Sequence, residues 1–290
     1  MTTRRPGTVI NLLWVTPWLV GLVLFFLLPM GMSFYYSLTD YSMLEVPLWI
    51  AFDNYAALFG DSVFWLAVRN TLIYAAISIP LAAIVSLGIA GLLDTDHPVS
   101  HVVRVLVFAP TVVPLVAAAM IWLWLFNSDH GLINAGLSWV GVNGPNWLQE
   151  RGWAMAALIV MSLWSVGQAV VIYLAALQDV PSALVDAASI DGLGPVRRFV
   201  SVVLPTIAPA VVFNTIIQTI TAWQVFATPY IMTEGGPDRS TYFYSHYLYD
   251  QAFLFQNMGY ASALGWVQLL LITACIAVPY VMVRKFGGGP

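Results

Sequence analysis

The chain has 290 residues, of which 60% are hydrophobic and only 8% are charged, and its formal net charge is −4. A soluble globular domain carries about a quarter charged residues, so the composition excludes an ordinary soluble globule and indicates a protein that crosses a bilayer. The mild negative charge argues against a nucleic-acid partner. The one cysteine, Cys275, has no second cysteine in the chain to pair with, so an internal disulfide is excluded.

Six stretches of the chain lack Asp, Glu, Lys and Arg over the length of a membrane-spanning helix, which needs about 20 mostly apolar residues. We therefore predict an all-α polytopic membrane protein with six transmembrane helices, in which residues 1–290 form a single transmembrane domain. The predicted spans are residues 9–38, 68–93, 103–126, 153–177, 199–233 and 258–283. The first apolar run is too long for a cleaved signal peptide, so we expect this span to be retained.

Basic residues are distributed unequally between the two sides that these spans define. With the N-terminus inside, the inner segments hold Arg4, Arg5, Arg104, Arg197, Arg198, Arg284 and Lys285, whereas the outer segments hold Arg69, Arg151 and Arg239. Cytoplasmic segments carry the excess of Lys and Arg. The pattern therefore predicts that both termini, and the polar segment between spans four and five, lie in the cytoplasm.

The inner loop after span two contains His97 and His101, four residues apart and close to Asp94 and Asp96. Two histidines at this spacing on one helix could bind a metal ion. Pro98 lies between them and breaks the helix that would align them. We therefore predict structural or solvated roles for these residues, and no metal site.

Span three contains Pro110 and Pro114, which a membrane helix can tolerate when neighbouring groups satisfy the freed carbonyls. The outer loop that follows holds two short polar patterns. They are Gly131-Leu132-Ile133-Asn134 and Pro145-Asn146-Trp147-Leu148.

Uncharged polar side chains gather in spans four and five. Ser165 and Gln168 are three residues apart, while Asn214, Gln218 and Thr221 follow an i, i+4, i+7 stripe, so each set lies on one helix face. Unpaired polar groups are costly in a bilayer, which predicts that both faces line the bundle interior or a cavity. The candidate solute-path residues are Trp164, Ser165, Gln168, Asn214, Gln218, Thr221 and Trp223. Such groups suit a neutral polyhydroxylated ligand, and hydrogen bonding between helices explains them equally well.

Residues 180–205 form a polar island between two apolar runs. Pro181 suits the start of a helix, so a short helix is predicted over residues 182–190. Gly192 and Gly194 end it, because glycine accepts the left-handed conformation of a helix C-cap. Pro195 starts a second helix that runs up to Pro205.

This island resembles the signature loop of ABC-importer permeases, which reads E-A-A, three residues, G, nine residues, I-x-L-P. Here Asp186-Ala187-Ala188, Gly192 and Val202-Val203-Leu204-Pro205 keep every spacing. Asp186 replaces the family's glutamate and shortens the carboxylate arm by one methylene, and Val202 replaces isoleucine. In the family this loop is a coupling helix that docks on a cytoplasmic ATPase, which implies the same role for residues 179–198. The implied coupling residues are Asp186, Ala187, Ala188, Asp191, Gly192, Arg197 and Pro205.

Further patterns extend the resemblance from residue 52 to span six. They are Phe52-Asp53-Asn54-Tyr55, Arg69-Asn70-Thr71, the two outer-loop patterns above and residues 233–237, which resemble T-x-G-G-P. Together they are most similar to the permeases of carbohydrate importers, the maltose and glycerol-3-phosphate class. The resemblance implies a sugar-translocating subunit in the cell (inner) membrane. It also implies a second homologous permease, two ATP-binding subunits and an extracytoplasmic solute-binding protein as partners.

The family's sugar-contacting positions fall at Trp164, Ser165, Gln168, Gln218, Thr221 and Ala222. Alanine at position 222 is not a sugar-binding residue, so the resemblance implies a ligand that differs from the family's best-known sugars.

The chain lacks the means to hydrolyse ATP, because its only lysine, Lys285, is followed by Phe286 and no G-K-[ST] phosphate loop exists. We therefore expect a transport subunit that is not an enzyme and holds no cofactor, with ATP and Mg²⁺ bound by partner chains. One alternative is an ABC permease for a polyamine, amino acid or phosphate ester. A second is a self-sufficient secondary carrier or channel, although no ionisable residue lies at mid-span for a proton relay. A membrane-embedded enzyme is disfavoured, since no HExxH motif or facing acid pair occurs in the spans.

Overall fold

The computed structural model describes residues 7–95 and 97–286, with side chains for 14–95 and 97–277. Helices dominate this part of the chain, and its one sheet pairs only β1 (Thr39–Asp40) with β2 (Leu48–Trp49), antiparallel. The predicted all-α class is thereby confirmed. The described chain forms two compact units. Unit 1 contains the residues up to Asp61 together with Leu248–Val267, and unit 2 contains Ser62–Tyr247 and the residues from Gln268 onward.

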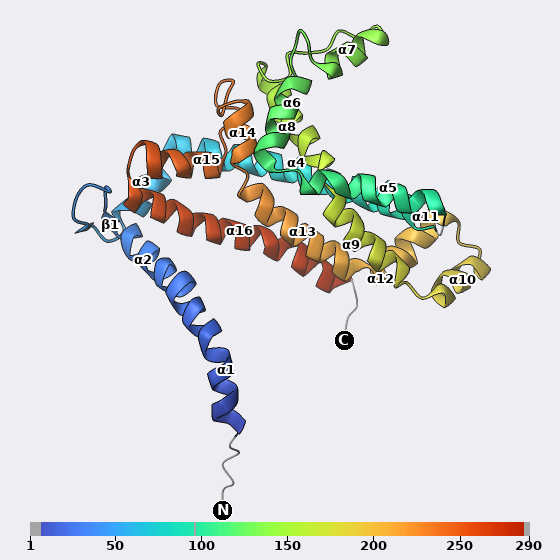
Figure 1. Ribbon diagram of the computed structural model, residues 1–290, viewed down its shortest axis with the longest axis horizontal. Helices are drawn as coiled ribbons and strands as arrows, with labels where there is room; N and C mark the ends of the chain where they lie inside the picture. Colours follow the sequence, from blue (N-terminus) through green and yellow to red (C-terminus); the bar gives the residue numbers. More distant parts are fainter. Residues whose placement is uncertain (1–6, 96, 287–290) are drawn as a thin grey trace, which may run out of the picture. The chain divides into compact units, whose positions relative to one another are not determined.

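Unit 1 begins with a continuous helical segment built from α1 (Gly7–Leu22), the π-helical turn η1 (Val23–Leu27) and α2 (Leu28–Ser37) (Figure 1). Its portion Trp14–Ser37 is long and apolar enough to cross a membrane. The unit continues with α3 (Asp53–Gly60), η4 (Asp250–Leu254) and the first turns of α16 (Met258–Phe286).

The Phe52-Asp53-Asn54-Tyr55 pattern builds a corner within unit 1. Asn54 Nδ2 donates to the carbonyls of Ser37 and Thr39, each at 2.9 Å, and the hydroxyls of Ser37 and Tyr55 lie 2.8 Å apart. A Cβ atom on Gly259 would lie 2.1 Å from the Thr39 carbonyl oxygen, so only glycine fits there. The pattern therefore holds the chain reversal after α2 by satisfying backbone carbonyls that leave a helix end.

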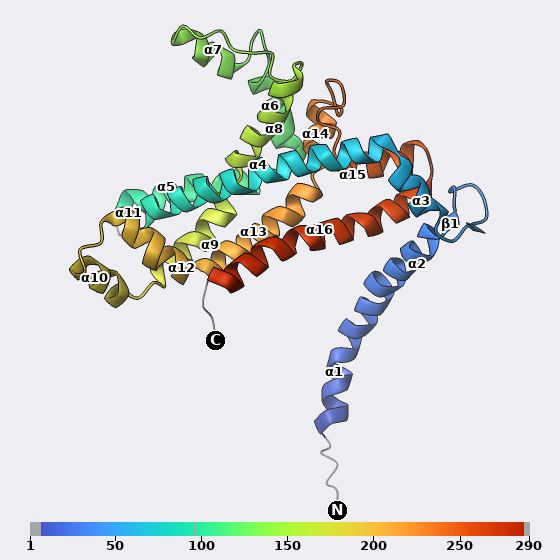
Figure 2. The same ribbon diagram turned by 180° about the vertical axis from the view of Figure 1, so that it is seen from behind.

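Unit 2 is a helical bundle in which the long helix α4 (Ser62–Leu93) is central. It packs against α8 (Arg151–Trp164), α9 (Gly167–Gln178) and α13 (Ala208–Trp223) (Figures 1 and 2). The remaining elements follow in chain order. They are α5 (Pro98–Phe108), η2 (Ala109–Val112), α6 (Leu115–Leu125), α7 (Leu132–Trp139), α10 (Ser182–Ile190), α11 (Pro195–Arg198), η3 (Phe199–Val203), α12 (Leu204–Thr206), α14 (Ala227–Met232) and α15 (Tyr244–Tyr249), the last of which ends in unit 1.

Three of the six predicted spans are single helices and three are bent helix pairs. Within the described residues, Trp14–Ser37, Ser62–Leu93 and Met258–Ala277 are each long and apolar enough to cross a membrane. The predicted third, fourth and fifth spans are instead broken, with bends of 101°, 50° and 73°. The described chain therefore offers three spanning helices, or up to six if each bent pair counts as one.

The sharpest break, of 101°, falls at Val113 and Pro114, within the predicted third span. Val113 is extended at ψ 128° and Pro114 caps the N-terminus of α6. A residue before proline avoids the helical region, and proline has no N–H for the preceding turn. Pro114 therefore ends one helix and starts another, rather than lying inside a single helix.

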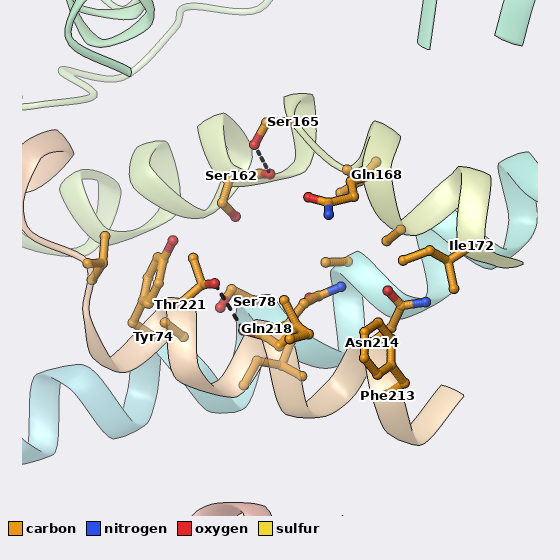
Figure 3. A pocket seen from close by; sticks show the side chains of 17 residues that line it. Tyr74, Ser78, Ser162, Ser165, Gln168, Ile172, Phe213, Asn214, Gln218 and Thr221 are labelled. Carbon is orange, nitrogen blue, oxygen red and sulfur yellow. Dashed lines mark hydrogen bonds between the residues drawn. The ribbon is translucent and has the colours of Figure 1, made fainter. Parts of the chain in front are cut away.

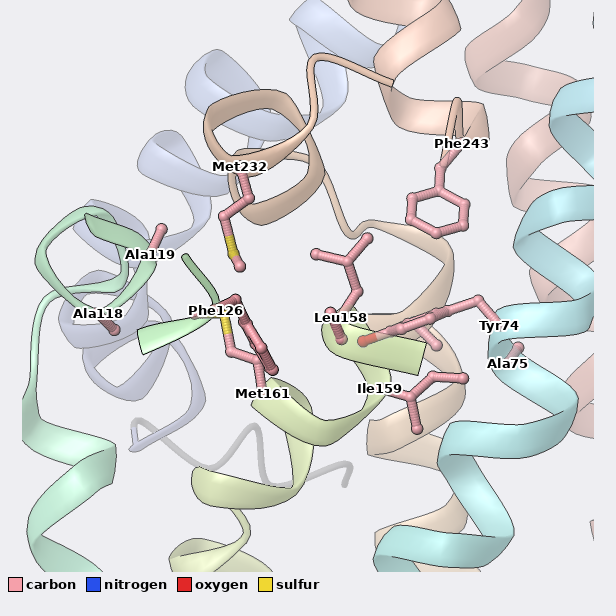
Figure 4. Close-up of a cluster of buried hydrophobic side chains, with 12 residues drawn as sticks. Tyr74, Ala75, Ala118, Ala119, Phe126, Leu158, Ile159, Met161, Met232 and Phe243 are labelled. Carbon is pink, nitrogen blue, oxygen red and sulfur yellow. The ribbon is translucent and has the colours of Figure 1, made fainter. Parts of the chain in front are cut away.

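Two apolar cores stabilise unit 2. The first core joins α4, α6, α8 and α13 to the segment around α14 (Figure 4), and its buried members are Tyr74, Ala75, Ala118, Ala119, Phe126, Ala157, Leu158, Ile159, Met161, Ala222, Met232 and Phe243. The second core joins α4 to the α8–α9 region, and its members are Ala82, Ala90, Leu93, Val166, Ala169, Val170, Tyr173 and Leu174.

Two patterns that are distant in sequence meet in unit 2. Asn70 Nδ2 donates to the carbonyls of Arg239 (2.7 Å) and Tyr242 (3.2 Å), and Thr71 Oγ1 accepts the Tyr244 N–H at 2.9 Å. The Arg69-Asn70-Thr71 pattern thus anchors the loop that follows Thr233–Pro237 to the start of α4.

The two outer-loop patterns likewise bond to each other. Trp147 Nε1 donates to Asn134 Oδ1 at 2.7 Å, and Asn134 Nδ2 donates to the carbonyls of Ser128 (3.1 Å) and Pro145 (3.2 Å). A Cβ atom on Gly131 would lie 2.4 Å from two backbone carbonyl oxygens. Asn134 therefore ties the two ends of the loop around α7 together.

Candidate functional site

A cavity of about 290 Å³ lies among α4, the α8–α9 pair and α13, bordering both apolar cores. Its apolar wall includes Ile79, Ile172, Phe213 and Ile217. Its polar groups come from all three sides (Figure 3), and they are Tyr74, Ser78, Ser162, Ser165, Gln168, Asn214, Gln218 and Thr221. None of the lining residues, all of which the structure describes, is charged.

The hydroxyl groups around this cavity mostly donate to their own helices. Ser162 donates to the Ile159 carbonyl at 2.7 Å and Thr221 to the Ile217 carbonyl at 2.9 Å. The Tyr74 hydroxyl is within hydrogen-bonding reach of Ser162. The hydroxyl oxygens remain available as acceptors for a ligand, because each has lone pairs that these bonds do not use.

The amide side chains are differently placed. Gln168 and Gln218 make no side-chain hydrogen bond to any residue in the described ranges. Asn214 is only 4% exposed, and although its side chain lies near the Tyr173 hydroxyl, its Nδ2 has no partner in the described chain. A buried donor without a partner is costly, so Asn214 favours a polar occupant in the cavity. Gln168 is exposed and Gln218 is half-buried, so their unused amide groups are open to a ligand at the cavity.

The break between α8 and α9 positions the side chains that these two helices contribute to the cavity. A Cβ atom on Gly167 would lie 2.4 Å from the Val107 carbonyl oxygen, so α9 approaches α5 as closely as backbones allow. The 50° bend falls at Ser165 and Val166, immediately before this contact. Because the chain turns here, Ser165 and Gln168 both border the cavity.

The structure brings together five of the seven predicted solute-path residues. Ser165, Gln168, Asn214, Gln218 and Thr221 all line the cavity, as does Ala222.

Trp164 and Trp223 do not line it. Trp164 packs edge-on against Trp122, with ring centroids 6.1 Å apart. Trp223 is 1% exposed and packs against Tyr244, with centroids 5.9 Å apart.

Three lining residues were missed from the sequence: Tyr74, Ser78 and Ser162. Tyr74 and Ser78 lie four residues apart in the second predicted span, which places them on one helix face. The same periodicity test that found the stripe on α13 could therefore have found this pair.

The helix α10 occupies the residues from which a short helix was predicted, with Pro181 as its N-cap. Gly192 has φ +77° and closes the helix. The Gly192 N–H donates to the Ser189 carbonyl at 3.1 Å and the Leu193 N–H to the Ala188 carbonyl at 3.0 Å. These paired bonds are the Schellman C-cap, which needs a left-handed residue at this position.

The α10 segment exposes a small acidic surface. Asp186, Ala187 and Asp191 are exposed, whereas Ala188 is buried at 6%. Two large apolar side chains, Leu184 and Ile190, are also exposed, at 47% and 86%. Large apolar side chains exposed beside small and acidic residues indicate that this short helix contacts another protein.

The helical segment that follows α10 continues past Pro205, the residue that was expected to end it. Arg197 is exposed, and Arg198 donates to the Ser189 hydroxyl. The π-helical turn η3 precedes Pro205, with the Leu204 N–H donating to the Phe199 carbonyl. Proline lacks an N–H, so a wider turn ahead of it keeps the helical path intact.

The two loop histidines show no metal arrangement in the described residues. His97 Nδ1 accepts the Val99 N–H at 3.2 Å and so caps α5. No group of three potential metal-binding side chains occurs in the searched part of the chain. Asp96 and the side chains of Arg4, Arg5, Arg284 and Lys285 lie outside the described residues.

Residues 84–287 match the family of binding-protein-dependent transport system inner membrane components. The chain belongs to this family. It is 37% identical over 263 residues to the probable ABC transporter permease protein YesP of Bacillus subtilis, covering 89% of this chain and 85% of YesP. It is 34% identical over 237 residues to the sulfoquinovosyl glycerol transport system permease protein SmoG of Agrobacterium fabrum, covering 81% and 77% of the two chains.

The permease also shares its fold with a bacterial ABC transporter involved in the import of the acidic polysaccharide alginate. The TM-score is 0.81 at 21% sequence identity, and the likeness covers 95% of both chains. A crystal structure of an alginate ABC transporter in complex with an alginate pentasaccharide-bound periplasmic protein gives the same TM-score at 20% identity. Family and fold together identify the permease as a polytopic inner-membrane subunit of a binding-protein-dependent ABC importer, which is a transport component and not an enzyme.

Proposed function

We propose that this permease carries a sugar or oligosaccharide through the cavity between α4, α8–α9 and α13. The observation that carries the proposal is the uncharged polar lining, in which three amides have donors or acceptors left over. Sugar hydroxyls both donate and accept, so they can satisfy amide and hydroxyl groups without a net charge. The relative SmoG, named for transport of sulfoquinovosyl glycerol, supports a sugar derivative as the solute class.

In this proposal residues 1–290 form one transmembrane domain with six spans, each bent helix pair counting as one. Both termini and α10 lie on the cytoplasmic side. The broken spans support such a role, because non-helical backbone at membrane depth is tolerated where it lines a cavity. The cavity borders one of these breaks, at Ser165 and Val166.

The proposed partners are a second homologous permease, two ATP-binding subunits and an extracytoplasmic solute-binding protein. ATP and Mg²⁺ would bind on the ATP-binding subunits. The helix α10 would dock on one of them through the exposed residues Asp186, Ala187 and Asp191, with Arg197 available to pair with its carboxylates, whereas Ala188 is buried within this chain. The Schellman turn at Gly192 and the helical path from Pro195 through Pro205 support a lever that reaches as far as the 73° bend before α13.

One alternative solute class is a charged small molecule, such as a phosphate ester. It would need a cationic group in the path, and the described lining of the cavity has none. A self-sufficient carrier is a second alternative, and it would transport without the ATP-binding subunits.

The test is transport by the purified importer complex in proteoliposomes with a panel of sugars, comparing Gln218→Leu with Gln224→Leu. Gln218 lines the cavity, whereas Gln224 is exposed at the end of α13 and does not line it. We expect transport of one sugar class to fall about tenfold in Gln218→Leu, since losing hydrogen bonds to a ligand costs about 1.4 kcal/mol or more. Equal transport in both variants, or transport by this chain alone, would overturn the proposal.

A further inference from the structure

A second cavity, of about 270 Å³, lies on the other side of the α8–α9 break. Arg104 and Gln178 are its polar lining residues, and Val107, Val170, Val171 and Leu174 form its apolar wall. Gly167 borders this cavity, whereas its neighbours Val166 and Gln168 border the solute cavity. The two cavities are therefore distinct and are separated by the first turn of α9.

Arg104 borders this cavity and forms no ion pair with any carboxylate in the described residues. Its Nη2 group donates to the carbonyls of Leu93 (2.7 Å) and Thr95 (3.3 Å), which close the C-terminal end of α4. Its Nε is buried and has no hydrogen-bond partner. A partly buried cation without a counter-charge favours an anion beside its accessible part.

The position of the cavity along α4 and α9 indicates how deep it would lie in a bilayer. Arg104 is held by Leu93, the last residue of α4, and Gln178 is the last residue of α9. Polar groups therefore gather where two apolar helices end, and the apolar wall begins within two turns of them. In a bilayer this is the boundary between headgroups and acyl chains, where arginine side chains meet lipid phosphates.

We propose that this cavity binds one phospholipid with an anionic headgroup. The lipid phosphate would accept from Arg104 and Gln178, while an acyl chain would cover Val107, Val170, Val171 and Leu174. The choice of an anionic over a zwitterionic lipid follows from the lining, since no acidic side chain borders the cavity to receive a headgroup amine. Among the described residues, the exposed carboxylates of Asp94 and Asp179 do not line it.

The test is native mass spectrometry of the complete importer complex, delipidated in detergent and titrated separately with phosphatidylglycerol, phosphatidylcholine and inorganic phosphate. We expect one phosphatidylglycerol bound per copy of this chain. We expect phosphatidylcholine to bind about tenfold more weakly, and inorganic phosphate not to displace the bound lipid.

Three variants locate the site. Ala175→Phe fills the cavity from its apolar side and leaves Arg104 intact, so it tests the site even if Arg104→Gln fails to assemble. Both variants should bind phosphatidylglycerol about tenfold more weakly, while Arg151→Gln, at an exposed arginine of α8, should bind it like the wild type. Equal binding of the two lipids, or wild-type binding in Ala175→Phe, would overturn the proposal. Displacement of the lipid by inorganic phosphate would do the same, because the site would then belong to a soluble anion.

Discussion

Two groups of amide side chains in this permease differ in what they bond. Asn54, Asn70 and Asn134 each donate to two backbone carbonyls within 3.2 Å. Gln168 and Gln218 border the cavity without side-chain hydrogen bonds in the described chain. In an apolar protein, a polar side chain that is fully paired stabilises the backbone, whereas an unpaired one beside a cavity is available to a ligand.

The first prediction tests the paired group at Asn70, which joins two segments that lie 169 to 172 residues apart in sequence. Asn70→Leu leaves the Arg239 and Tyr242 carbonyls without their donor, and each buried unpaired group costs about 1–3 kcal/mol. We expect the largest loss of stability among the variants considered, seen as a lower unfolding temperature of the detergent-solubilised complex and a lower yield. Asn70→Leu and Gln224→Leu form a matched pair, because each replaces one amide side chain by leucine. If both unfold at the same temperature, the proposed difference between paired and exposed amides is wrong.

The second prediction concerns the turn at Gly192 that ends α10. Gly192 has φ +77°, and a side chain in the left-handed region costs about 1–2 kcal/mol, more for a β-branched residue. Gly192→Val should therefore distort the end of α10 and abolish ATP-driven transport, while membrane insertion stays intact.

The control is Gly194→Ala, because Gly194 has φ −63° and nothing within 4 Å of an added Cβ atom. Proteoliposome transport and ATPase activity should be measured together. We expect Gly192→Val to lose the stimulation of ATPase activity by solute, and Gly194→Ala to keep it. Normal transport in Gly192→Val would remove the support for α10 as the coupling element.

The sequence was most informative where the signal is local. The bounds of α10 follow from Pro181 and Gly192, because capping depends on a few adjacent residues. The stripe of Asn214, Gln218 and Thr221 follows from helical periodicity alone, and all three line the cavity.

Features that depend on tertiary contacts could not be read in this way. The bend before Gly167 depends on the close approach of α9 to the Val107 carbonyl, and these residues are 60 positions apart by their numbers. Trp164 and Trp223 match the expected aromatic composition of a sugar path, yet each packs against another ring. An aromatic side chain buries a large apolar area when it packs inside the protein, so a tryptophan in the sequence does not by itself indicate a ligand contact.

The third prediction tests whether the unpaired amides act on one ligand. Gln168 and Gln218 come from opposite sides of the cavity (Figure 3), so a single sugar can bond to both. Each single change to leucine should lower the apparent affinity for the sugar about tenfold, and the double variant should lose less than the product of both effects. Transport kinetics of the four proteins form a double-mutant cycle. Strictly independent effects would indicate that the two amides do not share a ligand.

The fourth and smallest effect is expected at Asn214, a buried amide that lines the cavity. Its side chain lies near the Tyr173 hydroxyl while Nδ2 has no partner in the described chain, so Asn214→Leu removes one polar neighbour of that hydroxyl and one unpaired donor together. These contributions are opposite in sign, and we expect stability to change by less than about 1 kcal/mol. Adding Tyr173→Phe removes the orphaned hydroxyl and should recover part of any loss. Unfolding temperatures of the single and double variants measure this, and a large loss in both would show that Asn214 belongs with the structural amides and not with the cavity.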